Sequence, residues 1–129
     1  MITIDLRDKR PIYLQVIEGI EDLTIKGVLS PDEQLPSVRN LAVELSINPN
    51  TIQRAYLELE KRGTIYSIKG RGSFISPNNS ALTEAKRKEL YEDMADKVAE
   101  AKLLGISRDE FVAKVIRLYN AGKEGAEDD

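Results

Sequence analysis

Residues 37–63 read SVRNLAVELSINPNTIQRAYLELEKRG, and this segment contains two predicted helices joined by a short turn. Ser37 is a favoured helix N-cap, and apolar residues recur after it at helical spacing as far as Leu45. A second helix is predicted from Asn48-Pro49, because Asn caps helices well and Pro suits the first helical turn. Only the few residues around 46–48 separate the two helices, which is typical of a helix-turn-helix motif.

The helix that follows Asn48 has an apolar side and a polar side. We expect the apolar stripe to be buried, and it comprises Ile52, Ala55, Tyr56 and Leu59. We predict that the other side enters the major groove of DNA, where Arg reads guanine and Gln or Asn reads adenine. The residues predicted to bind DNA there are Asn50, Thr51, Gln53 and Arg54. The sequence leaves open a solvated face, with Thr51 only capping and with Gln53 and Arg54 binding phosphates.

Two further residues of this helix each have two possible roles. Leu57 lies on the polar side, where it either touches a thymine methyl group or packs under the segment that follows. Glu58 lies one turn beyond Arg54, so the two side chains can form an ion pair. Such a pair either orients Arg54 or competes with DNA for it.

A preceding helix and a following hairpin complete a small domain. Pro11 begins an amphipathic helix that is expected to end near Gly27. Residues 64–68 and 73–75 are rich in β-branched and aromatic side chains, and the glycine-containing turn between them predicts a β-hairpin. Three helices followed by two strands form a winged helix, which we place at residues 1–76.

The winged helix offers further contacts to DNA. Glycines flank Arg71 at the turn of the hairpin, so we predict a tight tip that inserts this arginine into the minor groove. Gly72 also lets the chain approach a phosphate closely, and Lys69 is expected to bind phosphate. Ser37 and Arg39 begin their helix where a backbone amide and a cation would grip another phosphate. Ser37 is expected to cap this helix as well.

A break in composition separates the winged helix from the rest of the chain. Residues 76–80 read SPNNS, so we place a linker at residues 77–80 and a helical region at residues 81–122. Residues 123–129 are predicted to form an acidic disordered tail.

Two amphipathic helices are expected in the region after the linker. The first runs from near Thr83 to near Gly105, and Ser107 caps the second in a capping box with Glu110. Two helices cannot bury this much apolar surface between themselves, so they pack either on the winged helix or, as we predict, on a second copy of the chain. The predicted dimerisation residues are Leu90, Met94, Val98, Phe111, Val115, Leu118 and Tyr119.

The composition of this chain of 129 residues excludes several classes of protein. It has no cysteine and no histidine, so disulfides, thiolate nucleophiles, Ser-His-Asp triads and zinc sites built from Cys and His are impossible. We predict no catalytic residue, no metal site, no cofactor and no enzymatic activity. No apolar run approaches the roughly 18 residues of a membrane span, and no secretory signal is visible. A cytoplasmic location without membrane contact is therefore expected.

The formal net charge of −3 hides a local basic excess. Residues 34–79 carry six Lys and Arg against three Asp and Glu, whereas the segments on either side are acidic. DNA binding is therefore expected to depend on a few placed arginines and on dimeric geometry rather than on overall charge.

Five short motifs follow one another through residues 11–76. They read PIYLQV at 11–16, LPSVRNLA at 35–42, NPNTIQRAY at 48–56, LEKRG at 59–63 and GRGSFI at 70–75. In order and spacing they resemble the DNA-binding domain of GntR-family bacterial transcription regulators. The short remainder of the chain is similar to the two-helix dimerisation appendage of the YtrA-like branch.

This resemblance implies a mainly α fold with a small β-wing, namely a winged helix-turn-helix DNA-binding domain followed by a two-helix dimerisation appendage. It also implies a sequence-specific regulator that represses transcription as a homodimer on a palindromic operator, commonly that of a transporter operon.

Two other functions stay open at this point. A helical module that binds protein instead of DNA would keep its partner after replacement of Arg39, Arg54 and Arg71. A repressor gated by a small ligand between the appendage and the winged helix is the other alternative, and no residue constellation specifies the chemistry of such an effector.

Overall fold

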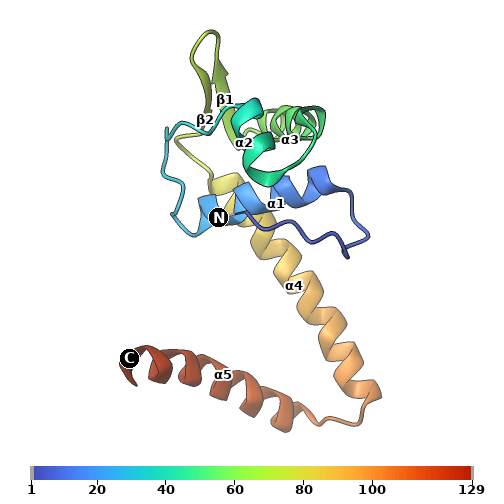
Figure 1. Ribbon diagram of the computed structural model, residues 1–129. Coiled ribbons are helices and arrows are strands. Elements are labelled where there is room, and N and C mark those ends of the chain that lie inside the picture. The colour runs from blue at the N-terminus through green and yellow to red at the C-terminus, as the bar shows by residue number, and fades with distance from the viewer. Residues whose placement is uncertain (1, 129) are drawn as a thin grey trace. The chain divides into compact units, whose positions relative to one another are not determined.

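The computed structural model describes the backbone of residues 2–128 and the side chains of residues 2–122. The chain divides into two compact units, Met1–Ala85 and Lys86–Asp129. The elements in chain order are α1 (Ile12–Ile25), α2 (Val38–Leu45), α3 (Pro49–Lys61), β1 (Ile65–Ile68), β2 (Gly72–Ile75), α4 (Ser80–Leu103) and α5 (Arg108–Asp128), as Figure 1 shows. This mostly helical chain with a two-stranded sheet confirms the predicted fold class.

The first unit is built around α3, against which α1 and α2 pack (Figure 1). The stripe predicted for α3 is buried as expected, since Ile52, Ala55 and Leu59 are 0% exposed and Tyr56 is 5% exposed. Aliphatic side chains from the other elements complete the core, among them Val16, Ile17, Ile20, Leu41, Ile65 and Ile75. Burial of this stripe orients α3 so that its polar side faces solvent.

The two helices of the helix-turn-helix begin at the residues that the sequence indicates. Ser37 Oγ accepts a hydrogen bond from the backbone N–H of Asn40 at 3.1 Å, and Asn48 Oδ1 accepts one from the N–H of Asn50 at 2.8 Å. Pro49 occupies the first helical turn of α3. These side chains satisfy backbone donors that a helix N-terminus leaves without an intrahelical partner, so both predicted caps are confirmed.

The hairpin has a third, irregular segment beside it. Strands β1 and β2 pair antiparallel, with Ile65 opposite Ile75 at the buried base. Along the other edge of β2, the N–H of Asp32 donates to the carbonyl of Ile75 and the N–H of Leu35 donates to the carbonyl of Ser73, both at 2.8 Å. Residues 32–35 therefore extend the wing, a feature that the sequence analysis did not predict.

Helix α4 begins earlier than the predicted start near Thr83. Asn78 Oδ1 accepts a hydrogen bond from the N–H of Ser80 at 3.0 Å, and this contact lets the helix begin at Ser80, which we had assigned to the linker. Ser107 Oγ accepts from the N–H of Glu110 at 3.2 Å, as expected for the cap of α5. The predicted domain limits stay predictions. The tail expected at residues 123–129 lies outside the described side chains.

Among the helices described in residues 2–128, none combines the length and the apolar character needed to cross a bilayer.

Candidate nucleic-acid interface

Helix α3 presents its polar side chains to solvent. Asn50, Gln53 and Arg54 are exposed and Thr51 is half-buried, while the neighbouring Ile52 and Ala55 are buried. The alternation follows from the helical period, since the buried stripe covers about a third of the circumference. All four predicted residues thus lie on or beside the free side of the second helix of a helix-turn-helix.

Arg54 lies on an aromatic ring that the sequence analysis did not single out. Its guanidinium carbon is 3.8 Å from the centroid of the Tyr13 ring, and Tyr13 belongs to α1. A guanidinium stacked on a ring keeps its N–H groups available at its edge, so the cation–π contact restrains Arg54 without consuming its donors. One signal was present in the sequence: Tyr13 is an aromatic residue outside the apolar stripe of its helix.

Glu58 does not pair with Arg54. Its carboxylate accepts instead from Arg62 Nε at 3.2 Å, one turn further along α3, and Arg62 also contacts the buried Glu21 of α1. The ion pair between Arg54 and Glu58 that the sequence allowed is therefore not formed. Leu57 is 56% exposed, so it does not pack under the hairpin and lies instead on the free side of α3.

The N-terminus of α2 is attached to α3 through one hydrogen bond. Tyr56 donates its hydroxyl proton to the carbonyl of Pro36 at 2.7 Å. Burial, together with the charge of Glu44, raises the pKa of Tyr56, so the hydroxyl stays a donor. The bonded carbonyl immediately precedes the cap residue Ser37, and Ser37 and Arg39 are both exposed. The two predicted phosphate ligands therefore begin a helix whose start is fixed to α3.

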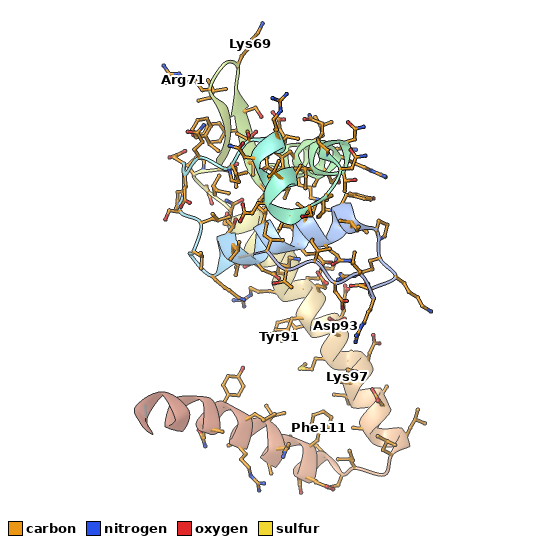
Figure 2. All side chains as sticks on the ribbon, viewed as in Figure 1. Lys69, Arg71, Tyr91, Asp93, Lys97 and Phe111 are labelled. Atoms are coloured by element: carbon orange, nitrogen blue, oxygen red, sulfur yellow. The ribbon has the colours of Figure 1, made fainter. Side chains whose placement is uncertain are left out.

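The tip of the hairpin carries the other predicted residues. Figure 2 shows Lys69 and Arg71 projecting outward from the turn between β1 and β2. Gly70 and Gly72 have φ values of +80° and +117°, which L side chains rarely adopt. The exposed side chain of Gln34 donates from Nε2 to the carbonyl of Arg71 at 2.7 Å. The sequence analysis missed Gln34, because no local pattern links residues so far apart in the chain.

Two sets of arginines in the first unit differ in their ion pairs. Arg10 is bound by Asp8 and Glu18, and Arg62 is bound by Glu21 and Glu58. Among the side chains of residues 2–122, no carboxylate lies within ion-pair distance of Arg39, Arg54 or Arg71. The charge of the paired arginines is balanced within the domain, whereas the other three leave their charge available to an external anion.

The predicted dimerisation residues lie on α4 and α5. Of these, only Phe111 is half-buried, and the others are exposed by at least 39%: Leu90, Met94, Val98, Val115, Leu118 and Tyr119. Figure 2 labels Phe111 near the start of α5. Within the described part of the chain, no group of three or more Asp or Glu residues is arranged to hold a metal ion.

Comparisons with known proteins agree on one family. Residues 12–75 match the family model described as bacterial regulatory proteins, gntR family. The HTH-type transcriptional repressor YtrA of Bacillus subtilis (strain 168) is 37% identical over 128 residues, which cover 96% of this chain and 98% of that protein.

Solved structures share the fold at similar identity. A transcriptional regulator from Oenococcus oeni is 34% identical with a TM-score of 0.78, covering 92% of this chain and 99% of that one. AraR(DBD), solved in complex with operator ORX1, is 31% identical with a TM-score of 0.50 and covers 52% of this chain and 81% of that one.

Proposed function

Because this chain belongs to the GntR family of bacterial regulatory proteins and is a DNA-binding transcription regulator, we propose that it acts as a homodimeric repressor on a palindromic operator. The observation that carries the proposal is the set of exposed arginines on α2, α3 and the hairpin that have no carboxylate partner among the described side chains. The relatives of this chain are transcription regulators rather than enzymes.

Bases are read from α3 in this proposal. Arg54 donates two hydrogen bonds to a guanine, a geometry that a planar guanidinium restrained on the Tyr13 ring reaches with little loss of side-chain freedom. Gln53 and Asn50 carry amides that can pair with adenine, and Thr51 supplies a hydroxyl beside them. Leu57 provides an apolar surface for a thymine methyl group.

Phosphates are bound by the elements that flank α3. Ser37 and Arg39 at the start of α2 grip one phosphate through a backbone amide and a cation, while Lys69 binds another from the hairpin. Arg71 enters the minor groove beside the half-site, and Gly72 lets the chain pass close to the DNA backbone. These contacts set the register of α3 in the major groove.

Dimerisation is assigned to α4 and α5. Leu90, Leu118 and Tyr119 are 65%, 62% and 80% exposed in the single chain, an unusual surface for a chain that remains monomeric. A two-fold partner would cover this surface and would present two copies of α3 to two half-sites about one helical turn or a multiple apart. The target that follows from the resemblance to the YtrA-like branch is the operon of a transporter.

Selection from a random pool of double-stranded DNA tests the proposal. The selected sequences should form an inverted repeat, and light scattering should give the mass of two chains. Arg54→Ala should weaken binding to the selected duplex and relax the preference at one base pair of each half-site, by about 1–3 kcal/mol for each bidentate contact. Lys26→Ala, which removes an exposed cation at the end of α1, is the matched control and should leave binding unchanged.

Two results would refute the proposal. A selection that returns no enriched sequence would contradict operator binding, and a protein partner retained by the triple Ala variant at Arg39, Arg54 and Arg71 would favour the interaction module instead.

A further inference from the structure

The hairpin is held at its tip by a side chain from a distant part of the chain. Gln34 donates from Nε2 to the carbonyl of Arg71 at 2.7 Å, although 37 positions separate the two residues. Both residues are exposed. In the turn itself, the N–H of Arg71 donates to the carbonyl of Ile68 at 2.9 Å, and the strand pairing ends with Ile68 opposite Gly72.

The segment that carries Gln34 is itself fixed at several points. Backbone hydrogen bonds join Asp32, Glu33 and Leu35 to β2, and Tyr66 donates its hydroxyl proton to Asp32 Oδ1 at 2.8 Å. This hydrogen bond raises the pKa of Tyr66. Gln34 therefore stands on a backbone that is already attached to the wing, and from there its side-chain amide reaches the carbonyl of Arg71.

The absence of a side chain at Gly72 leaves space for the amide of Gln34. A Cβ built at Gly72 would lie 3.0 Å from Gln34 Nε2, closer than nearly all such contacts in proteins, and its φ of +117° also disfavours any side chain. The glycine thus leaves room for the amide to reach the neighbouring carbonyl. The sequence analysis explained Gly72 only by the turn and by the approach to a phosphate.

The same segment also leads to the phosphate-binding end of α2. Only Leu35 and Pro36 separate Gln34 from the cap Ser37, and Tyr56 of α3 binds the carbonyl of Pro36 at 2.7 Å. Residues 34–37 therefore connect the hairpin tip, the start of α2 and the middle of α3.

We propose that Gln34 is a positioning residue for DNA binding: its amide holds the carbonyl of Arg71 and so fixes how far the Arg71 side chain stands from α2 and α3. The inference rests on the proposed function, in which Arg71 enters the minor groove. A two-stranded ribbon alone is marginally stable, so loss of the amide lets the tip move and spreads Arg71 over several positions.

A double-mutant cycle on the full-length protein tests this role, with a selected operator duplex as the probe. Gln34→Met keeps the length of the side chain and removes its donor. Because a hydrogen bond contributes about 0.5–1.5 kcal/mol, this variant should weaken operator binding about two- to tenfold at each of the two half-sites. In an Arg71→Ala background, Gln34→Met should change the affinity less than about 1.5-fold, because the group it positions is gone.

Ser67→Ala is the matched control on the same hairpin. It removes the side-chain contact between Ser67 and Ser73 at 3.2 Å, does not touch the tip, and should leave affinity unchanged. Amide hydrogen exchange of free Gln34→Met should rise at residues 69–72, whether or not DNA is present.

Four outcomes would overturn the proposal. An equal loss from Gln34→Met in both backgrounds would show that Gln34 contacts DNA directly or supports the fold generally. Wild-type affinity in Gln34→Met, or no effect of Arg71→Ala, would show that the tip needs no positioning. Failure of the proposed function would give a different result, because the wild-type protein would then bind no selected duplex at all. Unchanged amide hydrogen exchange at residues 69–72 in Gln34→Met would refute the role of Gln34 even in that case.

Discussion

Replacement of Tyr13 should reveal how strongly the ring supports Arg54. The guanidinium carbon lies 3.8 Å from the ring centroid, Arg54 is exposed and Tyr13 is half-buried. A cation–π contact at an exposed site contributes about 0.5–1 kcal/mol, which corresponds to about two- to fivefold in a binding constant. Tyr13→Leu removes the ring from both subunits and should therefore weaken operator binding by that factor at each half-site, about five- to thirtyfold in all.

Two further variants separate the ring from its hydroxyl group and from Arg54. Tyr13→Phe keeps the aromatic face and should bind as the wild type does. In an Arg54→Ala background, Tyr13→Leu should have no further effect, because no guanidinium then lies on the Tyr13 ring. Tyr13→Leu should also reduce the discrimination at the base pair that Arg54 reads, while binding to a scrambled duplex stays unchanged.

Fluorescence anisotropy of a labelled operator duplex measures these constants, and circular dichroism verifies that each variant is folded. Equal losses for Tyr13→Phe and Tyr13→Leu would mean that the hydroxyl group, and not the ring, contributes to binding. If Tyr13→Leu causes a loss of the same size in the Arg54→Ala background, the Tyr13 ring does not act through Arg54.

Three other substitutions, two of them with a control variant, test the fold and the dimer. Ile52→Ala should lower the free energy of unfolding by about 2–5 kcal/mol, because Ile52 is 0% exposed, whereas the exposed Leu57→Ala should cost far less; chemical denaturation measures both. Ser37→Ala should cost about 1 kcal/mol in the same assay through loss of the α2 cap, and an unchanged midpoint would contradict the cap. Val115→Asp should shift the mass by light scattering from two chains to one, whereas Lys114→Asp, at the adjacent position of α5, should remain dimeric; a dimeric Val115→Asp would place the interface elsewhere.

The local signals of the sequence suffice for much of the fold. Ser37 and Asn48-Pro49 mark helix starts through chemistry within three residues, and the buried stripe of α3 follows from a 3.6-residue period. Both signals involve residues that lie only a few positions apart in the chain, so they are visible in the sequence. For this reason the winged helix and the solvent-facing polar side of α3 could be predicted from the sequence.

Contacts between distant segments could not be predicted in this way. Arg54 stacks on Tyr13, and Gln34 donates a hydrogen bond to the carbonyl of Arg71. Glu58 forms its ion pair with Arg62 and not with Arg54. In each case the partner depends on how the elements pack or on which of several neighbours binds more favourably. The early start of α4 has the same origin, since the side chain of Asn78 supplies a cap that the linker composition concealed.

Titration of a selected operator duplex and of a scrambled duplex over a range of salt concentrations tests the central claim most directly. If Arg39 and Lys69 of both subunits each neutralise one phosphate, the logarithm of the operator binding constant should fall with the logarithm of salt with a slope of about −3 to −4. At physiological salt the operator should bind at least about a thousandfold more tightly than the scrambled duplex. Equal affinity for the two duplexes, or binding that does not respond to salt, would contradict the claim that this chain is a sequence-specific DNA-binding repressor.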